Sequence, residues 1–443
     1  MFLNKLILSI GCSVIAMTSC GLGDKQVESL DETRKTSDDY YEESSLRYED
    51  KIYKEGIATP IAFVGEWETS YPFLKLNSGQ AITFMFDDLN EKLSYYNYKV
   101  IHCDRNWNPS DLMTSEYLDG FDGNPINDWV ESFNTYVKYV NYRLILPNDD
   151  VKFTKSGNYI LYVYEDNEET PVLTKRFVIY EEQATISSEI KRPTDIDDMA
   201  YKQQINMSID ISSTQVSDPF RELDLCILQN GRWDNAIRSV NPQFVQDQVL
   251  SYEYQDELCP WGNAEYRPLD LKSTRYRGEK IDKIQLEADH VYHFYLLPET
   301  SLGHTTYISS RDINGKFLIK DEEAQNQHTD ADYTIVHFQL KADRPYEKGN
   351  VYVYGNFCTN PLDDTYRMHY NEEKRLYELK LQLKQGYYNY MYAIPNKEGV
   401  MDVAEIEGTH YETENDYAII VYRKNFSEGY DQIIGLKVKN TAQ

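Results

Sequence analysis

Basic residues are scarce in this chain. Its 443 residues include 45 lysines and arginines against 73 aspartates and glutamates, for a formal net charge of −28. Nucleic acids and anionic lipid surfaces attract proteins through positive charge, so this composition argues against both as partners. A net charge far from zero also keeps a protein soluble, which is sufficient to explain the acidity.

Cysteine is rare as well, with six residues and no CxxC pair. This scatter gives no support to a zinc site or to thioredoxin-type chemistry. Cys226 and Cys259 are the only pair expected to share a domain. An exported protein is permitted disulfides, and the sequence leaves open whether this pair forms one.

Catalytic signatures are missing too. The chain has no GxSxG, no phosphate-binding glycine loop, no HExxH and no EF-hand loop. Carboxylates are so numerous that no pair stands out as a general acid and base. The sequence therefore nominates no enzyme, and it predicts neither a cofactor nor a metal site.

A long apolar run occurs once, from Leu6 to Met17. It is shorter than the ~20 residues of a membrane-spanning helix, so residues 1–19 are interpreted as a secretory signal peptide. Met17-Thr18-Ser19-Cys20 has the pattern of a lipobox. Cys20 is therefore expected to carry the lipid that anchors the protein to a membrane. The alternative is an ordinary signal peptide with a cysteine there by chance.

The sequence after Cys20 begins with a polar stretch and continues as β structure. Residues 20–56 are predicted to be a lipidated flexible stalk, because residues 21–56 are too polar and charged to bury much surface. Beyond it, segments such as 80–86, 333–343 and 376–386 alternate apolar and polar side chains, as half-buried strands do. Thirty-nine tyrosines suit such pleated surfaces.

The spacing of these strands predicts the fold class. Gly, Pro, Asn and Asp punctuate them at short intervals, which is typical of antiparallel sandwiches rather than of βαβ units. We expect an all-β protein of consecutive antiparallel β-sandwiches, Ig-like or early-set-like. Polar, strand-poor segments place their boundaries at 57–183, 184–323 and 330–443.

The stretch "YKVIHCDRNWNPSDL", residues 98–112, looks most like a site. If 98–103 is a strand, His102 and Cys103 face opposite sides and cannot bind one ion. His102 and Asp104 share a face, but two ligands are too few for a structural zinc. The turn formers that follow, with Trp107 as a buried anchor and Asn108 before a proline, favour a structural loop. A binding surface is the alternative.

Two further polar clusters lie later in the chain. His290 and His293 lie three apart in a predicted strand, so they face opposite sides and are not expected to share a metal. In "GTHYETEND", His410, Glu412 and Glu414 alternate at a hairpin. Solvated charge at a sheet edge is one interpretation, and a protein contact surface is the other.

Several stretches together resemble one family, the type IX secretion system plug proteins of Bacteroidetes. The resemblance covers residues 57 to 436, and its specific part is the HCDxxWNPS run followed by SEYLDGF. Its middle part is looser, with Trp261 and Arg267 in the segment "WGNAEYRP". The stretches are "LKLNSGQAITFMFDDL" (74–89), "YKVIHCDRNWNPSDLMTSEYLDGF" (98–121), "SFNTYVKYVNYRLILPND" (132–149), "SGNYILYVYEDNEETPVLTKRFVIYE" (156–181), "LQNGRWDNAI" (228–237) and "EGTHYETENDYAIIVYRK" (407–424).

The resemblance implies a role. Members of this family are all-β proteins that sit at the periplasmic mouth of a very large outer-membrane β-barrel translocon and close its pore when no cargo passes. Cys20 would then hold the protein in the outer membrane. Gly21 to Lys25 is not the acidic run of surface-exported lipoproteins in these bacteria, which favours the periplasmic face. The alternative is a glycan-binding lipoprotein, because residues 330–443 also resemble early-set sandwiches of starch-active proteins.

Overall fold

The computed structural model of the chain describes residues 46–90, 92–253 and 256–442. The expected signal peptide, the expected lipid-bearing Cys20 and most of the expected stalk lie outside these residues. The described residues all fall within one compact unit. None of the helices in the described part of the chain is long and apolar enough to span a membrane.

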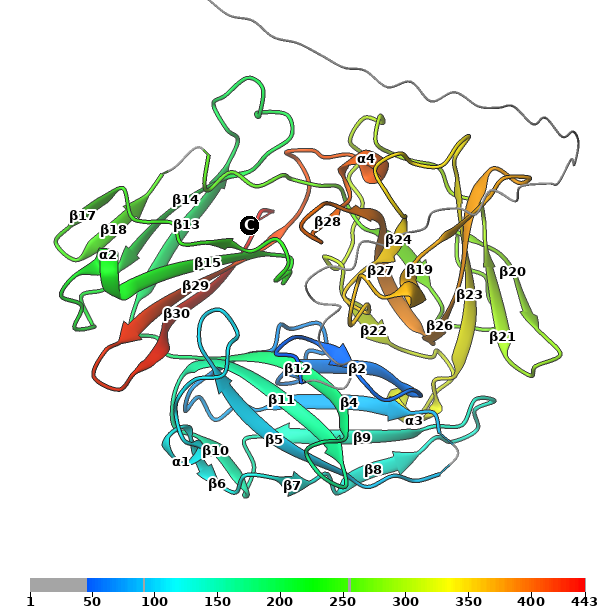
Figure 1. Cartoon of the computed structure of the whole chain (residues 1–443). Coiled ribbons are helices and arrows are strands. Elements are labelled where there is room, and N and C mark those ends of the chain that lie inside the picture. Colours follow the sequence, from blue (N-terminus) through cyan, green and yellow to red (C-terminus); the bar gives the residue numbers. More distant parts are fainter. Residues whose placement is uncertain (1–45, 91, 254–255, 443) are drawn as a thin grey trace, which may run out of the picture. The chain divides into compact units, whose positions relative to one another are not determined.

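The described chain is almost entirely β structure, which confirms the predicted fold class (Figure 1). Its four α-helices have four residues each, and one 3₁₀ segment has three. These segments are α1 Thr114–Tyr117, α2 Pro219–Glu222, α3 Gln327–Asp330, α4 Ala404–Glu407 and η2 Asp364–Tyr366.

The N-terminal sandwich packs two sheets around one apolar core. Ile82, Phe84 and Phe86 alternate into that core, as the sequence predicts. One sheet runs in the order β1 Lys51–Ile52, β12 Pro171–Tyr180, β11 Gly157–Glu165, β5 Tyr96–Cys103 and β7 Asn124–Pro125, with β3 Phe73–Lys75 paired to β12; the other runs β2 Ile57–Val64, β4 Ile82–Asp88, β9 Val140–Leu146 and β8 Asp128–Glu131. A separate ribbon of β10 Val151–Phe153 and β6 Leu118–Gly120 adds side chains to the same core.

The end of the expected stalk belongs to this sandwich, which corrects the predicted boundary at residue 57. Strand β1 pairs with β12 through Lys51 and Ile52. The guanidinium of Arg176 donates to the carbonyl oxygen of Tyr48 at 2.9 and 2.7 Å. Residues 46–56 are therefore folded, because β12 offers them an open edge for strand pairing and the partly buried guanidinium of Arg176 as a hydrogen-bond donor.

The middle sandwich is built from two distant parts of the chain. Its second sheet pairs β15 with β29, so that Leu223 to Gln229 lie beside Tyr417 to Arg423. The sheets are β13 Thr185–Lys191, β14 Gln204–Asp210, β18 Val249–Tyr252 and β17 Phe244–Gln246, and β16 Ile237–Arg238, β15 Leu223–Gln229, β29 Asp416–Asn425 and β30 Tyr430–Asn440. One core of aliphatic side chains lies between them.

The C-terminal sandwich is inserted between those two parts (Figure 1). Val336, Phe338 and Leu340 on its central strand are fully buried, as their alternation predicts. The sheets are β19 Arg267–Asp270, β27 Gly386–Pro395 and β22 Phe317–Ile319, with β24 Tyr352–Tyr354 and β28 Met401–Asp402 on β27, and β20 Ile281–Leu286, β21 Tyr292–Leu296, β23 Tyr333–Lys341, β26 Leu376–Lys384 and β25 His369–Asn371.

The expected segments 184–323 and 330–443 therefore do not each close a sandwich. Strands β19, β21 and β22 precede the predicted boundary yet pair with strands that follow it, and β29 and β30 return to the middle sandwich. Alternation marks which residues form strands, but it carries no information about which distant strand completes a sheet.

Candidate functional site

The loop after β5 is organised by the side chain of Asp104. Its Oδ1 accepts hydrogen bonds from the backbone N–H groups of Asn106 and Asn108, both at 2.8 Å, and its Oδ2 accepts one from the Asn108 side chain at 3.1 Å. Trp107 adopts a positive φ of 68° at the tip of this turn. The carboxylate of Asp104 is thus occupied in shaping the backbone.

His102 is buried behind this loop, with 1% of its surface exposed. Its Nδ1 lies 2.9 Å from Ser110 Oγ and its Nε2 3.3 Å from the Ser156 carbonyl oxygen. Burial lowers the pKa of His102 to about 4. The ring is therefore neutral at physiological pH and packs among tyrosines, including Tyr117 and Tyr159.

Trp107 joins the N-terminal sandwich to the middle one. Its ring centre lies 4.9 Å from that of Trp233 and 4.5 Å from the guanidinium carbon of Arg176. Beside it, the backbone N–H of Arg105 donates to Asp431 at 3.0 Å, and Arg238 donates to the Arg105 carbonyl at 2.8 Å. In this structure the stretch 98–112 contributes to an interface between sandwiches.

The four cysteines in the described residues carry free thiols, and all four are buried. Burial raises the pKa of Cys103 to about 12 and those of Cys226 and Cys259 to about 11. A thiol with such a pKa is a poor nucleophile at neutral pH. Cys226 and Cys259 form no disulfide here.

The structure separates Trp261 from Arg267. Arg267 is buried and binds two carboxylates: its Nη2 lies 2.8 Å from Glu407 and its Nη1 3.1 Å from Glu299. Trp261 is 52% exposed, with Lys202 Nζ 4.9 Å from its ring centre. Arg267 is thus part of a buried ion network, and Trp261 is a surface residue.

Glu412 and Glu414 are exposed at a pocket of about 220 Å³ near the end of β30. Glu265 lies in the same pocket, where it accepts hydrogen bonds from the Tyr307 hydroxyl at 2.5 Å and from the Glu414 backbone at 3.1 Å. Burial raises the pKa of Glu265 to about 6. No group of three or more His, Cys, Asp or Glu side chains among the described residues is placed to hold a metal ion.

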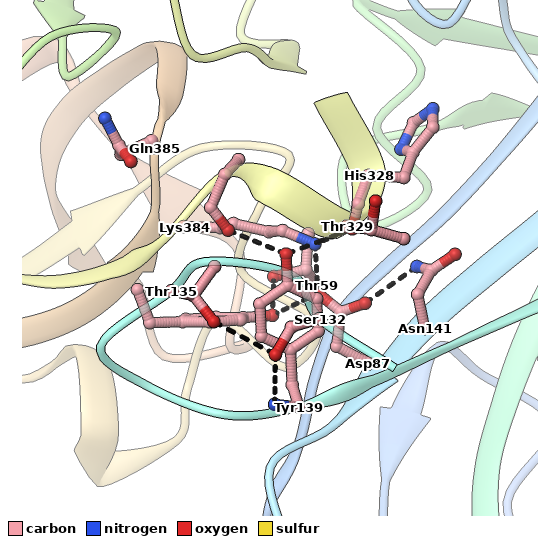
Figure 2. Close-up of polar contacts among 12 residues, drawn as sticks. Thr59, Asp87, Ser132, Thr135, Tyr139, Asn141, His328, Thr329, Lys384 and Gln385 are labelled. Carbon is pink, nitrogen blue, oxygen red and sulfur yellow. Dashed lines mark hydrogen bonds and ion pairs between the residues drawn. The ribbon is translucent and has the colours of Figure 1, made fainter. Parts of the chain in front are cut away.

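Sequence reasoning missed the polar joint between the N-terminal and C-terminal sandwiches. Lys384 Nζ lies 2.6 Å from Asp87 Oδ2 and 2.7 Å from the His328 carbonyl oxygen, and 4.1 Å from the ring centre of Tyr139. Asn141 donates to the other Asp87 oxygen at 2.7 Å. Figure 2 shows these side chains converging.

A second set of contacts surrounds this joint. Asp332, at the start of β23, accepts hydrogen bonds from the backbone N–H groups of Tyr136 and Val137 at 2.6 and 3.0 Å. The Tyr333 hydroxyl donates to Asp87 at 2.6 Å. Burial lowers the pKa of Lys384, while the adjacent Asp87 carboxylate opposes that shift. No sequence pattern marks Lys384, which stands in an alternating strand where an outward-facing lysine is expected.

All three sandwiches meet at a cavity of about 360 Å³. Three of the four cations that line it are paired with carboxylates: Lys175 with Asp50, Arg232 with Asp234 at 2.6 Å, and Lys316 with Asp416 at 3.2 Å. The fourth, Arg176, donates to the Tyr48 carbonyl oxygen. Because three of these charges already face a carboxylate, the cavity is poorly suited to bind an ionic substrate.

Comparison with known proteins identifies the family. Residues 57–181 match the model of the type 9 secretion system plug protein 1st domain. A crystal structure of a hypothetical protein from Parabacteroides merdae is 33% identical and superimposes with a TM-score of 0.86, covering 89% of this chain and 100% of that one. The chain belongs to the type IX secretion system plug protein family. The family resemblance of the sequence is thereby confirmed.

Membership in the plug family assigns the chain to the type IX secretion machinery of the cell envelope. A comparison with curated proteins found no match.

Two other solved structures align with low similarity. They are the C-terminal domain of the antigen I/II-family protein AspA from Streptococcus pyogenes, 8% identical over 86% of this chain and 98% of that one with a TM-score of 0.15, and dimeric latent PorU from Porphyromonas gingivalis, 10% identical over 88% and 34% with a TM-score of 0.14. At these scores they add nothing about the fold.

Proposed function

We propose that this protein is a non-catalytic plug that binds the periplasmic mouth of the type IX outer-membrane translocon and seals its pore when no cargo passes. A pore wide enough for folded cargo leaks small solutes when it is open. Sealing requires a body that keeps its shape while it makes reversible contacts, and no bond has to be made or broken.

The observation that carries this proposal is the mutual packing of the three sandwiches. The N-terminal sandwich binds the C-terminal one through Asp87 and Lys384, and the middle one through an apolar cluster around Trp107. The middle sandwich binds the C-terminal one through Arg232, which donates to the Met401 carbonyl at 2.8 Å. Since each sandwich is held by both others, bending between any two would break buried contacts with the third.

Exposed aromatic side chains near α3 provide contact points for the translocon. Trp67, Phe133 and Tyr136 are 77%, 71% and 52% exposed. Glu68, beside Trp67, lies 3.0 Å from His328, and the Phe133 N–H donates to the Thr329 carbonyl at 2.9 Å. Large apolar side chains on a fixed surface are typical of binding hot spots.

The lipid anchor belongs to the same proposal. A lipid on Cys20 in the inner leaflet of the outer membrane would keep the body close to the translocon and raise its local concentration. Metabolic labelling with a fatty acid tests this step, because label should enter the wild type and be absent from a Cys20→Ala variant. Protease added to intact cells should leave the protein uncut if it faces the periplasm.

The plug function is tested in two stages. First, a tagged full-length chain is isolated from its native outer membrane in mild detergent, where a very large β-barrel at near-equal stoichiometry is expected. Second, a deletion strain should leak a small periplasmic solute, and the wild-type gene should stop the leak. A deletion strain that stays as tight as the wild type would contradict pore sealing.

The contact surface is tested with charge substitutions. Trp67→Asp combined with Phe133→Asp should reduce recovery of the β-barrel and restore the leak, while the protein still folds. Tyr276→Asp is the matched control, because this 75% exposed tyrosine lies on the C-terminal sandwich. If the Trp67→Asp/Phe133→Asp variant and the Tyr276→Asp control had equal effects, Trp67 and Phe133 would not belong to the interface.

The glycan-binding alternative is not favoured by the buried tyrosines of β24 and β27. Sugar stacking needs exposed rings, but Tyr354, Tyr388, Tyr390 and Tyr392 are at most 4% exposed. Three of them pack in the core of the C-terminal sandwich, and Tyr354 packs in the apolar cluster beside it. Calorimetric titration with soluble glucans should therefore detect no binding.

A further inference from the structure

Two histidines meet on the outer face of the C-terminal sandwich. Strands β21 and β23 are parallel neighbours, and Phe294 pairs with Val336 between them. Both of those side chains are fully buried in the core, so the residues beside them, His293 and His337, point away from it. His293 Nδ1 lies 2.9 Å from His337 Nε2.

The ring of His293 is held in one orientation by Asp289. The Asp289 carboxylate lies 3.0 Å from His293 Nε2. A hydrogen on Nε2 donates to that carboxylate, which leaves the Nδ1 lone pair directed at His337. The same carboxylate–histidine arrangement orients many metal-binding imidazoles and raises their basicity.

The ring of His337 is held by a stacked tyrosine. Tyr295 lies 4.1 Å from it, centre to centre, with an interplanar angle of 17°. The Tyr295 hydroxyl in turn donates to Glu287 at 2.8 Å. Both imidazoles are therefore positioned before any ligand arrives, which lowers the entropic cost of binding.

Neutral imidazole is the form that binds transition metals. The charged groups that face the pair are Lys283, Glu287, Asp289 and Lys380, with Glu378 and its partner Lys374 beyond them.

We propose that His293 Nδ1 and His337 Nε2 together bind a divalent transition-metal ion such as Zn²⁺ in place of the hydrogen bond between them. For this, the proton on His337 Nε2 moves to Nδ1 of the same ring, so no net proton is released. Two protein ligands are fewer than the four of a structural zinc site or the three of a catalytic one, so water fills the remaining positions. The described residues place no third His, Cys, Asp or Glu side chain to complete the site.

The sequence could not show this pair. His290 and His293 are three apart in the sequence and do not meet, whereas the partner of His293 lies 44 residues further on. Parallel pairing of β21 with β23 brings His293 and His337 together. The inference does not depend on the proposed plug function.

The test is calorimetric titration of the full-length, untagged protein with Zn²⁺ at neutral pH. We expect one saturable site per chain. His293→Asn and His337→Asn should each weaken binding at least tenfold. Asp289→Asn should weaken it about tenfold through the lost orientation of His293. His290→Asn is the matched control, because it removes an exposed neighbouring imidazole that does not touch the pair.

Two readouts separate a specific site from general effects. The thermal midpoint of each metal-free variant should match that of the wild type, and Zn²⁺ should raise the midpoint of the wild type and the His290→Asn variant only. Binding should weaken at acidic pH, because protons compete for both imidazoles. Weak, unsaturable binding, or binding that persists in both His293→Asn and His337→Asn, would overturn the proposal.

Discussion

Lys384 Nζ and Asp87 Oδ2 are 2.6 Å apart and both side chains are 1% exposed, although the residues lie 297 positions apart in the sequence. Replacing both charges of a buried ion pair by apolar groups changes stability little, but removing one partner leaves the other charge buried without a counter-charge. We infer that the pair favours this docking of the N-terminal sandwich on the C-terminal one.

Breaking the pair should be costly. Lys384→Met is expected to lower the free energy of unfolding by about 3–5 kcal/mol, because Asp87 is left buried without its cation. Asp87→Asn combined with Lys384→Met should recover much of that loss. Lys380→Met, on the exposed side of the same strand, should change it by less than ~0.5 kcal/mol. Denaturant unfolding measures all three; equal losses in the single and double variants would contradict the coupling.

Stability should depend on pH through His102. Its pKa is about 4 in the folded protein against 6.5 as the ordinary value. Between these values the unfolded chain therefore binds more protons than the folded protein. The contribution of His102 to the free energy of unfolding is complete above pH 6.5 and is lost as the pH falls toward 4. The loss amounts to about 3 kcal/mol. A His102→Gln variant should show a shallower decline over the same range in denaturant unfolding at several pH values.

Gly157 should not tolerate a side chain. A Cβ atom at this position would lie 2.2 Å from His102 Nε2, and the residue has a φ of +152°. Gly157→Ala is expected to cost about 2–4 kcal/mol of unfolding free energy. Gly79→Ala is the control, since its φ is +76° but no atom lies within 4 Å of the new Cβ, so only about 1 kcal/mol of backbone strain is expected.

The cost of Gly157→Ala has two possible causes, the clash with the His102 ring and backbone strain, and a second substitution separates them. If the clash with the His102 ring is the cause, the cost of Gly157→Ala should fall to about 1 kcal/mol in a His102→Ala protein. An unchanged cost would show that backbone strain, and not the ring, excludes the methyl group.

Trp107 and Trp261 should differ sharply when truncated. Trp107→Ala empties the interface with Trp233 and is expected to cost about 3–5 kcal/mol. Trp261→Ala removes a half-exposed ring and one lysine contact, and should cost less than about 1 kcal/mol. Limited proteolysis between the N-terminal and middle sandwiches should accelerate only in the Trp107 variant. Similar rates in both would contradict a joint at Trp107.

The thiols provide a direct test of the cysteine assignment. A version of the protein lacking residues 1–20 retains Cys103, Cys226, Cys259 and Cys358, all buried and free. Without reductant, a thiol reagent should react only slowly with the native protein. In denaturant it should react with four thiols per chain. A count of two would mean that Cys226 and Cys259 are joined by a disulfide after all.

The buried lysine also shows how far alternation predicts a position. Leu379, Leu381 and Leu383 face the core as expected, and Gln382 is exposed. Lys384 continues the outward pattern but is buried, because another sandwich covers the end of β26 at Asp87. A local pattern records which side of its own sheet a residue faces and cannot record what packs against that side.

The sequence by itself determined the strands, the two faces of each sheet and the family. These depend on neighbours in the chain: apolar and polar side chains alternate with the period of a strand, and the run from His102 to Ser110 is read as a motif. Only the tertiary structure decided that β29 completes the middle sandwich, that His293 meets His337 and that Asp87 pairs with Lys384. Each of these unites residues far apart in the sequence, and their meeting depends on which strands and sandwiches come together, which no local pattern encodes.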